Sequence, residues 1–337
     1  MRAGAWPASE RPLRVAIVGA GQWGRQHARV FASRPDTDLR AVAARRKEHA
    51  TTRAAEWGIR AYTSVTDMID AERPELVSLC LPNEEHFDVT MQVIDSGVPL
   101  LAEKPLVFNL AQADQLLAAA EQRKLFFAIN FNHRYAEPVR RALGAVRAGD
   151  LGDVLFATWR FGGERGTGRH PHANLIETQC HGLDMLEYLC GPIASVMAQM
   201  TARHGQYTTL AVALGFANGG VGTLLGSYDS SYAYPGAQFL ELNGTAGRLT
   251  VEDTVRRFTF SRAGQETRQV WEAGYFNDAD RGFHQTFDRH VDAMLAALRA
   301  GAPPPIQARA GRRALEIAYS IISSFEAGQR VPVPGPR

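Results

Sequence analysis

The stretch that decides the fold is Val15-Ala-Ile-Val-Gly-Ala-Gly-Gln-Trp-Gly24. Its apolar first half predicts a buried strand, and its second half has the GxGxxG spacing that leads from such a strand into a helix. Glycines there permit a tight turn, close approach of the backbone to a pyrophosphate, and close packing of helix on strand. The helix N-terminus also favours phosphate. The motif predicts a Rossmann dinucleotide site, with a glycine turn for packing alone as the alternative. The expected cofactor contacts are Gly19, Gly21, Gln22, Trp23 and Gly24.

The next expected strand, residues 39–44, bears on the choice of cofactor. An NAD-binding site of this type carries Asp or Glu at the end of that strand, where it binds the ribose 2′-hydroxyl. Here the strand leads directly into Arg45, Arg46 and Lys47. Arginine binds a 2′-phosphate through two hydrogen bonds, whereas a carboxylate would repel it. We therefore expect NADP(H) rather than NAD(H), with Arg45 and Arg46 at the phosphate; otherwise both are the solvated start of a helix.

The pattern of apolar residues predicts two domains with a boundary near Phe131. In 13–131, strands alternate with helices, which is typical of a parallel sheet covered on both faces. In 132–337, short strands joined by Gly and Asn-Gly turns predict a mostly antiparallel sheet with a few helices. The expected strands are 13–18, 39–44, 76–81, 99–103, 126–130, 154–161, 195–202, 208–216, 221–227, 239–242, 248–251 and 257–261. The expected helices are 22–32, 46–57, 84–95, 110–124, 138–148, 175–190, 282–299 and 310–324.

Composition excludes several classes of protein. The 337 residues are 45% hydrophobic and 21% charged, with a net charge of +2, which favours neither nucleic acid nor an anionic membrane as partner. No apolar run is long enough for a membrane span, and residues 1–12 resemble a flexible tail rather than a signal peptide. Three cysteines without a CxxC motif predict no disulfide framework. We expect a cytoplasmic enzyme. Of the 37 basic residues only Lys47, Lys104 and Lys124 are lysine.

Five motifs, in order along the chain, carry a resemblance to a known family. They are LPNEEH at 81–86, Glu103-Lys-Pro105, FNHRY at 131–135, GTAG at 244–247, and the Pro-Pro and Ala-Leu-Glu pattern within 301–317. They are similar to the TPNxxH, EKP, domain-entry, Gly-xx-Gly and C-terminal motifs of the Gfo/Idh/MocA family, which includes glucose–fructose oxidoreductase and inositol 2-dehydrogenase. The resemblance implies an N-terminal Rossmann domain and a C-terminal, mostly antiparallel open sheet for substrate binding and oligomerisation, with the last helix packing back on the first domain.

The resemblance also implies the catalytic residues. Lys104 matches the family lysine that hydrogen-bonds the reacting oxygen of the substrate and the nicotinamide ribose. The family pattern DxGxHxxD is similar to residues 177–184, so that His181 is the expected acid/base, and histidine titrates near neutral pH. Glu177 replaces the usual Asp and Gln179 the usual Gly, so the pocket must differ in shape. If 175–190 is one helix, Glu177, His181 and Asp184 share a face.

Further contacts are expected around these residues. Pro82, Asn83, His86 and Glu103 follow the family's cofactor-binding motifs, and Trp23 and His86 are expected near the pyrophosphate and nicotinamide. A glycine-rich loop, 161–172, precedes the catalytic helix, and such loops commonly carry substrate contacts. A zinc site built on His170, His172 and His181 lacks the supporting Cys or carboxylate spacing, so we expect no metal. The expected substrate contacts are Asn132, Arg134, Arg169, His172 and Asp184.

These features predict an NADP(H)-dependent oxidoreductase that interconverts a secondary alcohol and a ketone on a sugar, sugar derivative or cyclitol. The expected preference for NADP(H) favours a ketoreductase. The alternatives are an NAD(H)-dependent sugar or inositol dehydrogenase, and a catalytically silent nucleotide-binding sensor. Reduction of a C=N or C=C bond is disfavoured because such relatives commonly lack EKP. The resemblance implies a homodimer or homotetramer, and apolar residues at 210, 212, 214, 221 and 224 could supply either its interface or the core.

Overall fold

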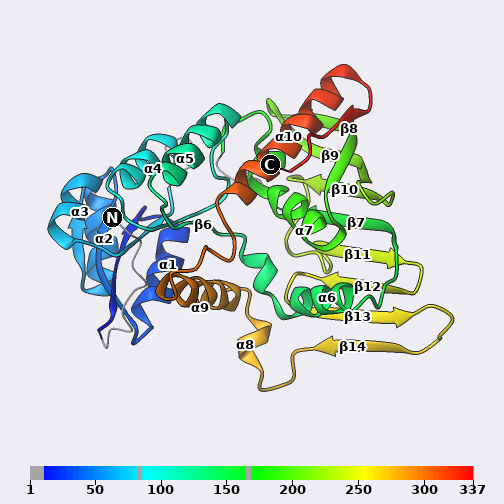
Figure 1. Cartoon of the computed structure of the whole chain (residues 1–337), viewed down its shortest axis with the longest axis horizontal. Coiled ribbons are helices and arrows are strands. Elements are labelled where there is room, and N and C mark those ends of the chain that lie inside the picture. The colour runs from blue at the N-terminus through cyan, green and yellow to red at the C-terminus, as the bar shows by residue number, and fades with distance from the viewer. Residues whose placement is uncertain (1–10, 82–85, 164–167, 337) are drawn as a thin grey trace. The chain divides into compact units, whose positions relative to one another are not determined.

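A computed structural model describes residues 11–81, 86–163 and 168–336 (Figure 1). The described residues form two compact units. The first comprises those up to Phe131 together with Phe287–Arg312, and the second comprises Asn132–Thr286 together with those from Arg313 onward. Within the described ranges, no helix is both long and apolar enough to cross a membrane.

The first unit is built on a six-stranded parallel sheet of order β3-β2-β1-β4-β5-β6. This is the Rossmann order, so the predicted fold class is confirmed. The central strands are apolar and buried on both faces, as in a sheet covered by helices on each side. The strands are β1 (Leu13–Val18), β2 (Thr37–Ala43), β3 (Arg60–Tyr62), β4 (Leu76–Leu79), β5 (Leu100–Ala102) and β6 (Phe127–Ile129). The helices up to Phe131 are α1 (Gln22–Ala32), α2 (Lys47–Trp57), α3 (Val65–Glu72), α4 (His86–Asp95) and α5 (Leu110–Gln122).

Helix α9 (Gln285–Arg299) belongs mostly to this unit, although the sequence placed residues 132–337 together. It is held to α1 by ion pairs such as Arg29–Asp288, at 2.5 Å, and its last turn reaches Asp36 through Arg299, at 2.6 Å. These contacts join residues about 260 positions apart, which explains why local sequence pattern did not reveal them. The expected helix 282–299 corresponds to α9, which begins at Gln285, and a short helix that was not expected, α8 (Asp278–Arg281), precedes it.

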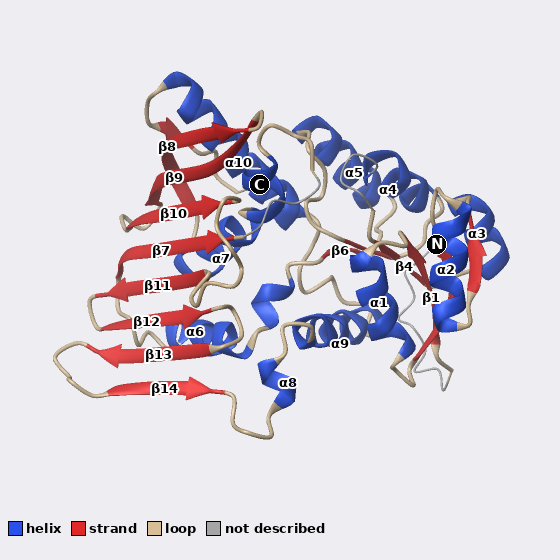
Figure 2. Cartoon of the chain, turned by 180° about the vertical axis from the view of Figure 1, so that it is seen from behind, coloured by secondary structure: helices blue, strands red, loops and turns tan. Residues whose placement is uncertain are grey.

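The second unit is built on a nine-stranded sheet of order β14-β13-β12-β11-β7-β10-β9-β8-β15 (Figure 2). Only the β7–β10 pair among these described strands is parallel, which confirms the predicted mostly antiparallel sheet. The strands are β7 (Val154–Gly162), β8 (Ile193–Arg203), β9 (Gln206–Phe216), β10 (Val221–Ser227), β11 (Gln238–Gly244), β12 (Gly247–Glu252), β13 (Arg257–Arg262), β14 (Arg268–Glu272) and β15 (Val331–Pro332). The helical segments are a 3₁₀ turn (Asn132–Tyr135), α6 (Glu137–Arg147), a π turn (Asn174–Thr178), α7 (Cys180–Cys190), α8 and most of α10 (Arg309–Ala327).

The two faces of this sheet differ because side chains alternate along each strand. Leu210, Val212, Leu214 and Leu224 are all buried in the core, which decides the alternative left open by the sequence for these four. The opposite face, here called the open face, carries apolar side chains that are 39–58% exposed. The register places them on one surface of β7, β8 and β10. They are Phe156, Met197, Val221 and Leu225.

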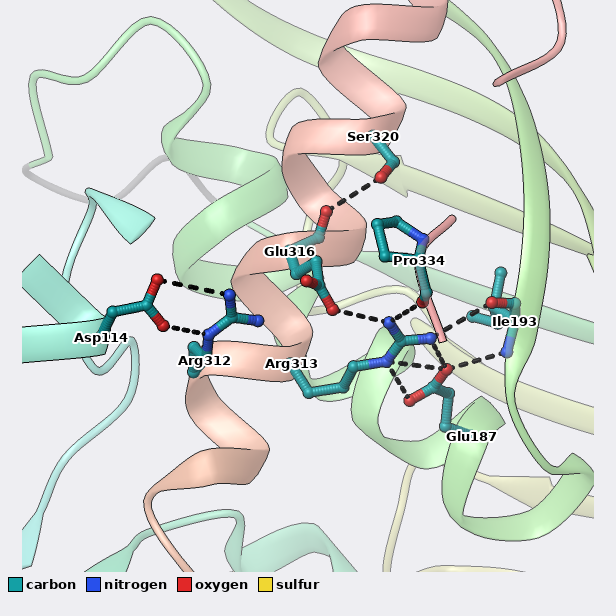
Figure 3. Close-up of polar contacts among 8 residues, drawn as sticks. All are labelled: Asp114, Glu187, Ile193, Arg312, Arg313, Glu316, Ser320 and Pro334. Atoms are coloured by element: carbon teal, nitrogen blue, oxygen red, sulfur yellow. Dashed lines mark hydrogen bonds and ion pairs between the residues drawn. The ribbon is translucent and has the colours of Figure 1, made fainter. Parts of the chain in front are cut away.

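A largely buried arginine near the start of α10 connects several segments of the second unit (Figure 3). The Arg313 guanidinium donates to the Glu187 carboxylate of α7 at 2.7 Å, to Glu316 at 2.8 Å and to the Pro334 carbonyl at 2.6 Å. It also donates to the carbonyl of Ile193, where β8 begins. One side chain therefore connects α7, α10, β8 and the C-terminal segment.

Candidate active site

The glycine loop has the geometry that a dinucleotide requires. Gly19 has a φ of +114°, and a Cβ there would lie 2.1 Å from the Cys80 carbonyl oxygen. A Cβ on Gly24 would lie 1.9 Å from the carbonyl oxygen of Gly19, so both glycines are needed for packing. Gly21 differs, because a Cβ there would meet nothing within 4 Å. Helix α1 begins directly after Gly21 without a side-chain cap or an acidic residue in its first turn. The loop thus fits a pyrophosphate beside Gly21.

Three arginines lie at or near the β2–α2 connection, and one of them contacts the glycine loop. Arg45 and Arg46 lie between β2 and α2 with exposed side chains, beyond a strand that ends without a carboxylate. Arg53 was not singled out from the sequence, yet its guanidinium donates to the carbonyl of Ala20 at 3.0 Å. It also pairs with Glu56. The one feature of the sequence that could have indicated a role for Arg53 is its position two turns into the helix that follows Arg46.

Glu103 is the centre of a buried polar network beneath the EKP motif. Its Oε1 accepts hydrogen bonds from Asn130 Nδ2 at 2.6 Å and lies 2.8 Å from His27 Nε2. His27 Nδ1 lies 2.7 Å from Ser78 Oγ, and His290 Nδ1 lies 2.7 Å from Asn130 Oδ1. The network therefore joins α1, β4, the ends of β5 and β6, and α9. From its motif, Glu103 is expected to contact the cofactor, whereas in this structure its carboxylate is hydrogen-bonded within the first unit.

The charges within this network follow from its geometry. Burial by itself would lower the pKa of His27, but Cys80 and the Glu103 carboxylate outweigh it and raise that pKa to about 10. Burial likewise opposes ionisation of Glu103, yet the hydrogen bond and charge of His27, together with the Lys104 charge, hold its pKa below the usual value. His27 and Glu103 thus form a buried ion pair. Lys104 follows directly, half-buried, and its backbone N–H donates to Glu103 Oε2 at 3.2 Å.

Two other predicted cofactor residues are held by neighbours in the same unit. His86 is buried, with Nε2 2.8 Å from the Leu81 carbonyl and Nδ1 3.3 Å from the Leu106 carbonyl. Burial lowers its pKa, which favours the neutral ring. Trp23 is 45% exposed and stacks on Phe287 with ring centroids 5.6 Å apart. Gln22 is exposed, and Pro82 and Asn83 lie outside the described residues.

In the second unit, the expected single helix over 175–190 is wrong. A π turn, Asn174–Thr178, ends at Gln179, where α7 begins. Gln179, at the junction of the two segments, is fully buried and hydrogen-bonded on several sides. Its amide accepts from Trp159 Nε1 at 3.1 Å and donates to Asn174 Oδ1 at 3.0 Å. Glu177 therefore lies on a wider turn than His181, so the shared α-helical face expected from spacing does not apply to it.

The carboxylate of Glu177 lies against the backbone of the glycine-rich loop. A Cβ on Gly168 would come within 2.2 Å of Glu177 Oε1. The side chain of Gln179 packs against Gly226 of β10, where a Cβ would lie 2.5 Å from Gln179 Cδ. The replacement of the family glycine by Gln179 is thus accommodated by a glycine on the neighbouring strand.

His181 lies on the first turn of α7, where its ring is buried against another histidine. The His133 and His181 rings stack with centroids 3.9 Å apart and an angle of 6° between their planes. The next residue, Gly182, allows the indole of Trp159 to approach the helix, since a Cβ there would be 2.3 Å from its Nε1. His133 lies within the FNHRY motif, but the sequence alone predicts no role for it.

Arg134 and Asp184, both predicted to bind substrate, are bound to each other. Arg134 Nε and Nη2 donate to the two oxygens of Asp184 at 2.8 and 2.5 Å, and the guanidinium lies 4.2 Å from the Tyr188 ring centroid. Burial raises the pKa of Asp184 although Arg134 opposes the shift. Asn132 is buried too, and its amide donates to Thr286 at 2.7 Å. These three residues support the site from within the second unit.

The remaining predicted contacts lie on the loop before the π turn. His172 stacks on Tyr207, with centroids 4.7 Å apart, and burial lowers its pKa. Arg169 is exposed. Among the residues that the structure describes, no three His, Cys, Asp or Glu side chains form a group suited to a metal ion. The cysteines at 80, 180 and 190 are buried free thiols.

Comparison with known proteins agrees with this arrangement of two units. Residues 13–131 match the description "Oxidoreductase family, NAD-binding Rossmann fold", and residues 144–333 match "Oxidoreductase family, C-terminal alpha/beta domain". The chain belongs to the Gfo/Idh/MocA family. The resemblance predicted from the motifs is therefore confirmed. The family description names NAD, so the NADP(H) preference stays a prediction.

Individual members of the family give further detail. Myo-inositol 2-dehydrogenase of Thermotoga maritima is 23% identical over 335 residues, which are 95% of this chain and 98% of that protein. D-glucoside 3-dehydrogenase of Escherichia coli is 34% identical over 154 residues, so the match spans less than half of either protein, 44% of this chain and 43% of the relative. A structure of levoglucosan dehydrogenase in complex with NADH has a TM-score of 0.88 at 18% identity, covering 96% of this chain and 100% of that chain, and shows the shared fold.

Proposed function

We propose that this oxidoreductase interconverts a secondary alcohol and a ketone on a sugar, sugar derivative or cyclitol. The observation that carries the proposal is the EKP segment, in which a buried ion pair fixes the backbone directly before Lys104. The His181 motif of the second unit supports it, as do the family's inositol and glucoside dehydrogenases.

The roles of the residues follow from their chemistry. Bound in the glycine loop, the nicotinamide cofactor supplies the hydride acceptor or donor. His181 exchanges the proton of the substrate hydroxyl, because imidazole titrates near neutral pH. Lys104 donates a hydrogen bond to the reacting oxygen and stabilises the negative charge that develops there. Glu177 accepts a hydrogen bond from a neighbouring hydroxyl and so orients the ring.

We propose NADP(H) as the preferred cofactor, and this preference favours ketone reduction in the cell. The support is the end of β2, which offers the exposed Arg45 and Arg46 and no carboxylate to the ribose. Titration of protein fluorescence with NADPH and NADH tests the preference. Arg45→Ala and Arg46→Ala should each weaken NADPH binding about tenfold and leave NADH binding nearly unchanged. Tighter binding of NADH by the unmodified protein would contradict the proposal.

The reaction itself is tested by following nicotinamide absorbance with a panel of sugars, keto-sugars and inositols in both directions. Lys104→Met should reduce kcat by at least about a hundredfold while leaving NADPH binding intact, because it removes a group that acts on the developing charge. Turnover retained by this variant would remove Lys104 from the mechanism. Cofactor binding without turnover of any substrate would instead favour a silent nucleotide-binding sensor.

We also propose that two or four copies associate through the open face in the cytoplasm, where the three thiols would stay reduced. Four apolar side chains of this face are 39–58% exposed, whereas residues that alternate with them on β8 and β10, such as Val196, Ala198 and Leu224, are buried. Exposed apolar patches of this kind are typical of protein–protein contacts.

A further inference from the structure

Two stacked histidines lie in the second unit, and only one of them, His181, has a role in the proposed reaction. His133 comes from the 3₁₀ turn that opens the unit, and His181 comes from the first turn of α7. Their rings are parallel to within 6°, with centroids 3.9 Å apart, and both residues are at least 94% buried. The edge-on rings of Phe161 and Phe283, at 6.3 and 5.4 Å, flank His133.

Such a pair cannot titrate as two independent imidazoles. Two imidazolium rings in face-to-face contact would place like charges about 4 Å apart in a poorly hydrated site, which strongly disfavours the doubly protonated state. A first proton can be held by either ring, whereas a second one is taken up only at much lower pH. The pair therefore has two macroscopic pKa values that are separated by more than those of isolated histidines.

Other charged groups of this unit bear on the same rings. Arg134, next to His133, is neutralised by its two hydrogen bonds to Asp184, which lies one turn after His181. Glu177 and Cys180 precede His181, and the Cys180 thiol donates to the Glu177 carbonyl. His284 follows Phe283, whose ring contacts that of His133. The ion pair adds little net charge at these rings, and His133 is the titratable group whose ring lies face to face with that of His181.

We propose that His133 is a positioning residue that shares one proton with His181 and holds the acid/base ring in place by stacking. In alcohol oxidation, the substrate proton passes to His181 while both rings are neutral, so that the pair ends singly protonated. In ketone reduction, His181 gives its proton to the developing alkoxide, and the neutral pair remains. This inference rests on the proposed role of His181 as the acid/base.

A measurement on the unaltered chain tests the shared proton without any substrate. Histidine labelled with ¹³C at Cε1 gives ring signals that can be followed by NMR from pH 4 to 9 and assigned with His133→Phe and His181→Phe. We expect the signals of the two rings to move together over the first step and again at a lower pH. Two signals that each follow an independent one-proton curve near pH 6.5 would overturn the proposal.

Kinetics of His133→Phe provide the second test, because phenylalanine keeps the stack but cannot take a proton. Without His133, the first proton can be held by His181 alone. We therefore expect both the acidic limb of kcat/KM for oxidation and the alkaline limb for reduction to move downward, by about 0.3 pH unit for rings of equal affinity, and the plateau for reduction to rise about twofold. A merely structural role would change kcat or KM but not the positions of the limbs, and limbs unchanged in His133→Phe would overturn the proposal.

Controls separate this inference from the proposed function. His204→Gln alters an exposed histidine in the turn between β8 and β9, and should leave the pH profile unchanged. Thermal unfolding of His133→Phe checks that the variant is folded. If no substrate is turned over by the unaltered chain, the proposed function fails, whereas the NMR titration still decides whether the two rings share a proton.

Discussion

At the scale of single residues, the three glycines of the cofactor loop have different roles: Gly19 and Gly24 leave no room for a Cβ, whereas Gly21 does. Gly21→Val should fold normally, because a side chain at that position meets no protein atom within 4 Å. The same side chain would occupy the space expected for the pyrophosphate, so NADPH affinity should fall by at least about a hundredfold. Fluorescence titration with NADPH and thermal unfolding, measured on the same sample, check both halves of this prediction.

The matched control is Gly19→Ala, which adds a smaller side chain at a position with no room. Gly19 combines a φ of +114° with a Cβ position 2.1 Å from the Cys80 carbonyl oxygen. This variant should therefore lose thermal stability, with Tm falling several degrees, whereas Gly21→Val should not. Equal loss of stability in both variants would show that Gly21 also serves packing, which is the alternative that the sequence left open.

The sequence could predict the glycine loop because its function depends on residues next to one another. It could not predict the buried partner of Glu103, because His27 lies 76 residues away and only folding brings the two together. The same limit explains why Arg134 and Asp184 were expected to bind substrate, since both are polar and lie in family motifs. They are 50 residues apart, and nothing in the sequence around either one shows that they pair with each other. The stack of His133 on His181 likewise depends on two segments that meet only in the folded unit.

At the scale of elements, the His27–Glu103 pair links α1 to β5 and should make stability depend on pH. The folded pKa of His27 is raised to about 10, against about 6.5 for an unfolded histidine. Its stabilising contribution is therefore complete below about pH 6.5 and decreases as the pH rises toward 10. We expect Tm to fall between pH 7 and 10. At pH 7, His27→Gln should lower the free energy of unfolding by about 3 kcal/mol, and therefore the Tm. Its Tm should also depend less on pH than that of the unaltered chain.

Thermal unfolding from pH 6 to 10, followed by circular dichroism, checks this pH dependence. Tyrosines and lysines titrate near the upper end of the range in any protein, so the informative quantity is the difference between the two chains. Parallel profiles for His27→Gln and the unaltered chain would show that the imidazole is neutral in the folded state.

Helix α10 offers a comparison between two adjacent arginines (Figure 3). Arg313 is buried between Glu187 and Glu316, whose side chains are 15% and 6% exposed, so Arg313→Gln leaves two carboxylates without their cation. We expect a loss of about 3 kcal/mol, or roughly 5–10 °C in Tm. Arg312→Gln removes a pair with Asp114, which is 52% exposed, and should cost less than about 1 kcal/mol. Similar losses in the two variants, measured by differential scanning fluorimetry, would contradict the assignment of Arg313 as the main connection.

At the scale of the whole molecule, helix and sheet patterns predicted the fold class well, but they did not show which apolar strand residues face outward. Of the residues considered from the sequence for an interface, only Val221 is exposed, whereas Leu210, Val212, Leu214 and Leu224 fill the core. Alternation along a strand gives two faces but does not say which one helices cover, since the helices that cover it come from distant parts of the chain.

The exposed apolar side chains of the open face allow a prediction of how copies of the chain associate. Leu225 of β10 is 43% exposed, and the strand register places it on the same surface as Met197 of β8 and Val221. Leu225→Arg would bury a charge in any interface on this face, so we expect the oligomer to dissociate at micromolar concentration, with little change in the Tm of the isolated chain. Sedimentation velocity over a hundredfold range of concentration measures this. Phe276→Arg is the control, since Phe276 is 92% exposed outside the sheet and should leave the oligomer intact. A chain that is monomeric before substitution, or an oligomer that tolerates Leu225→Arg, would rule out the open face as the interface.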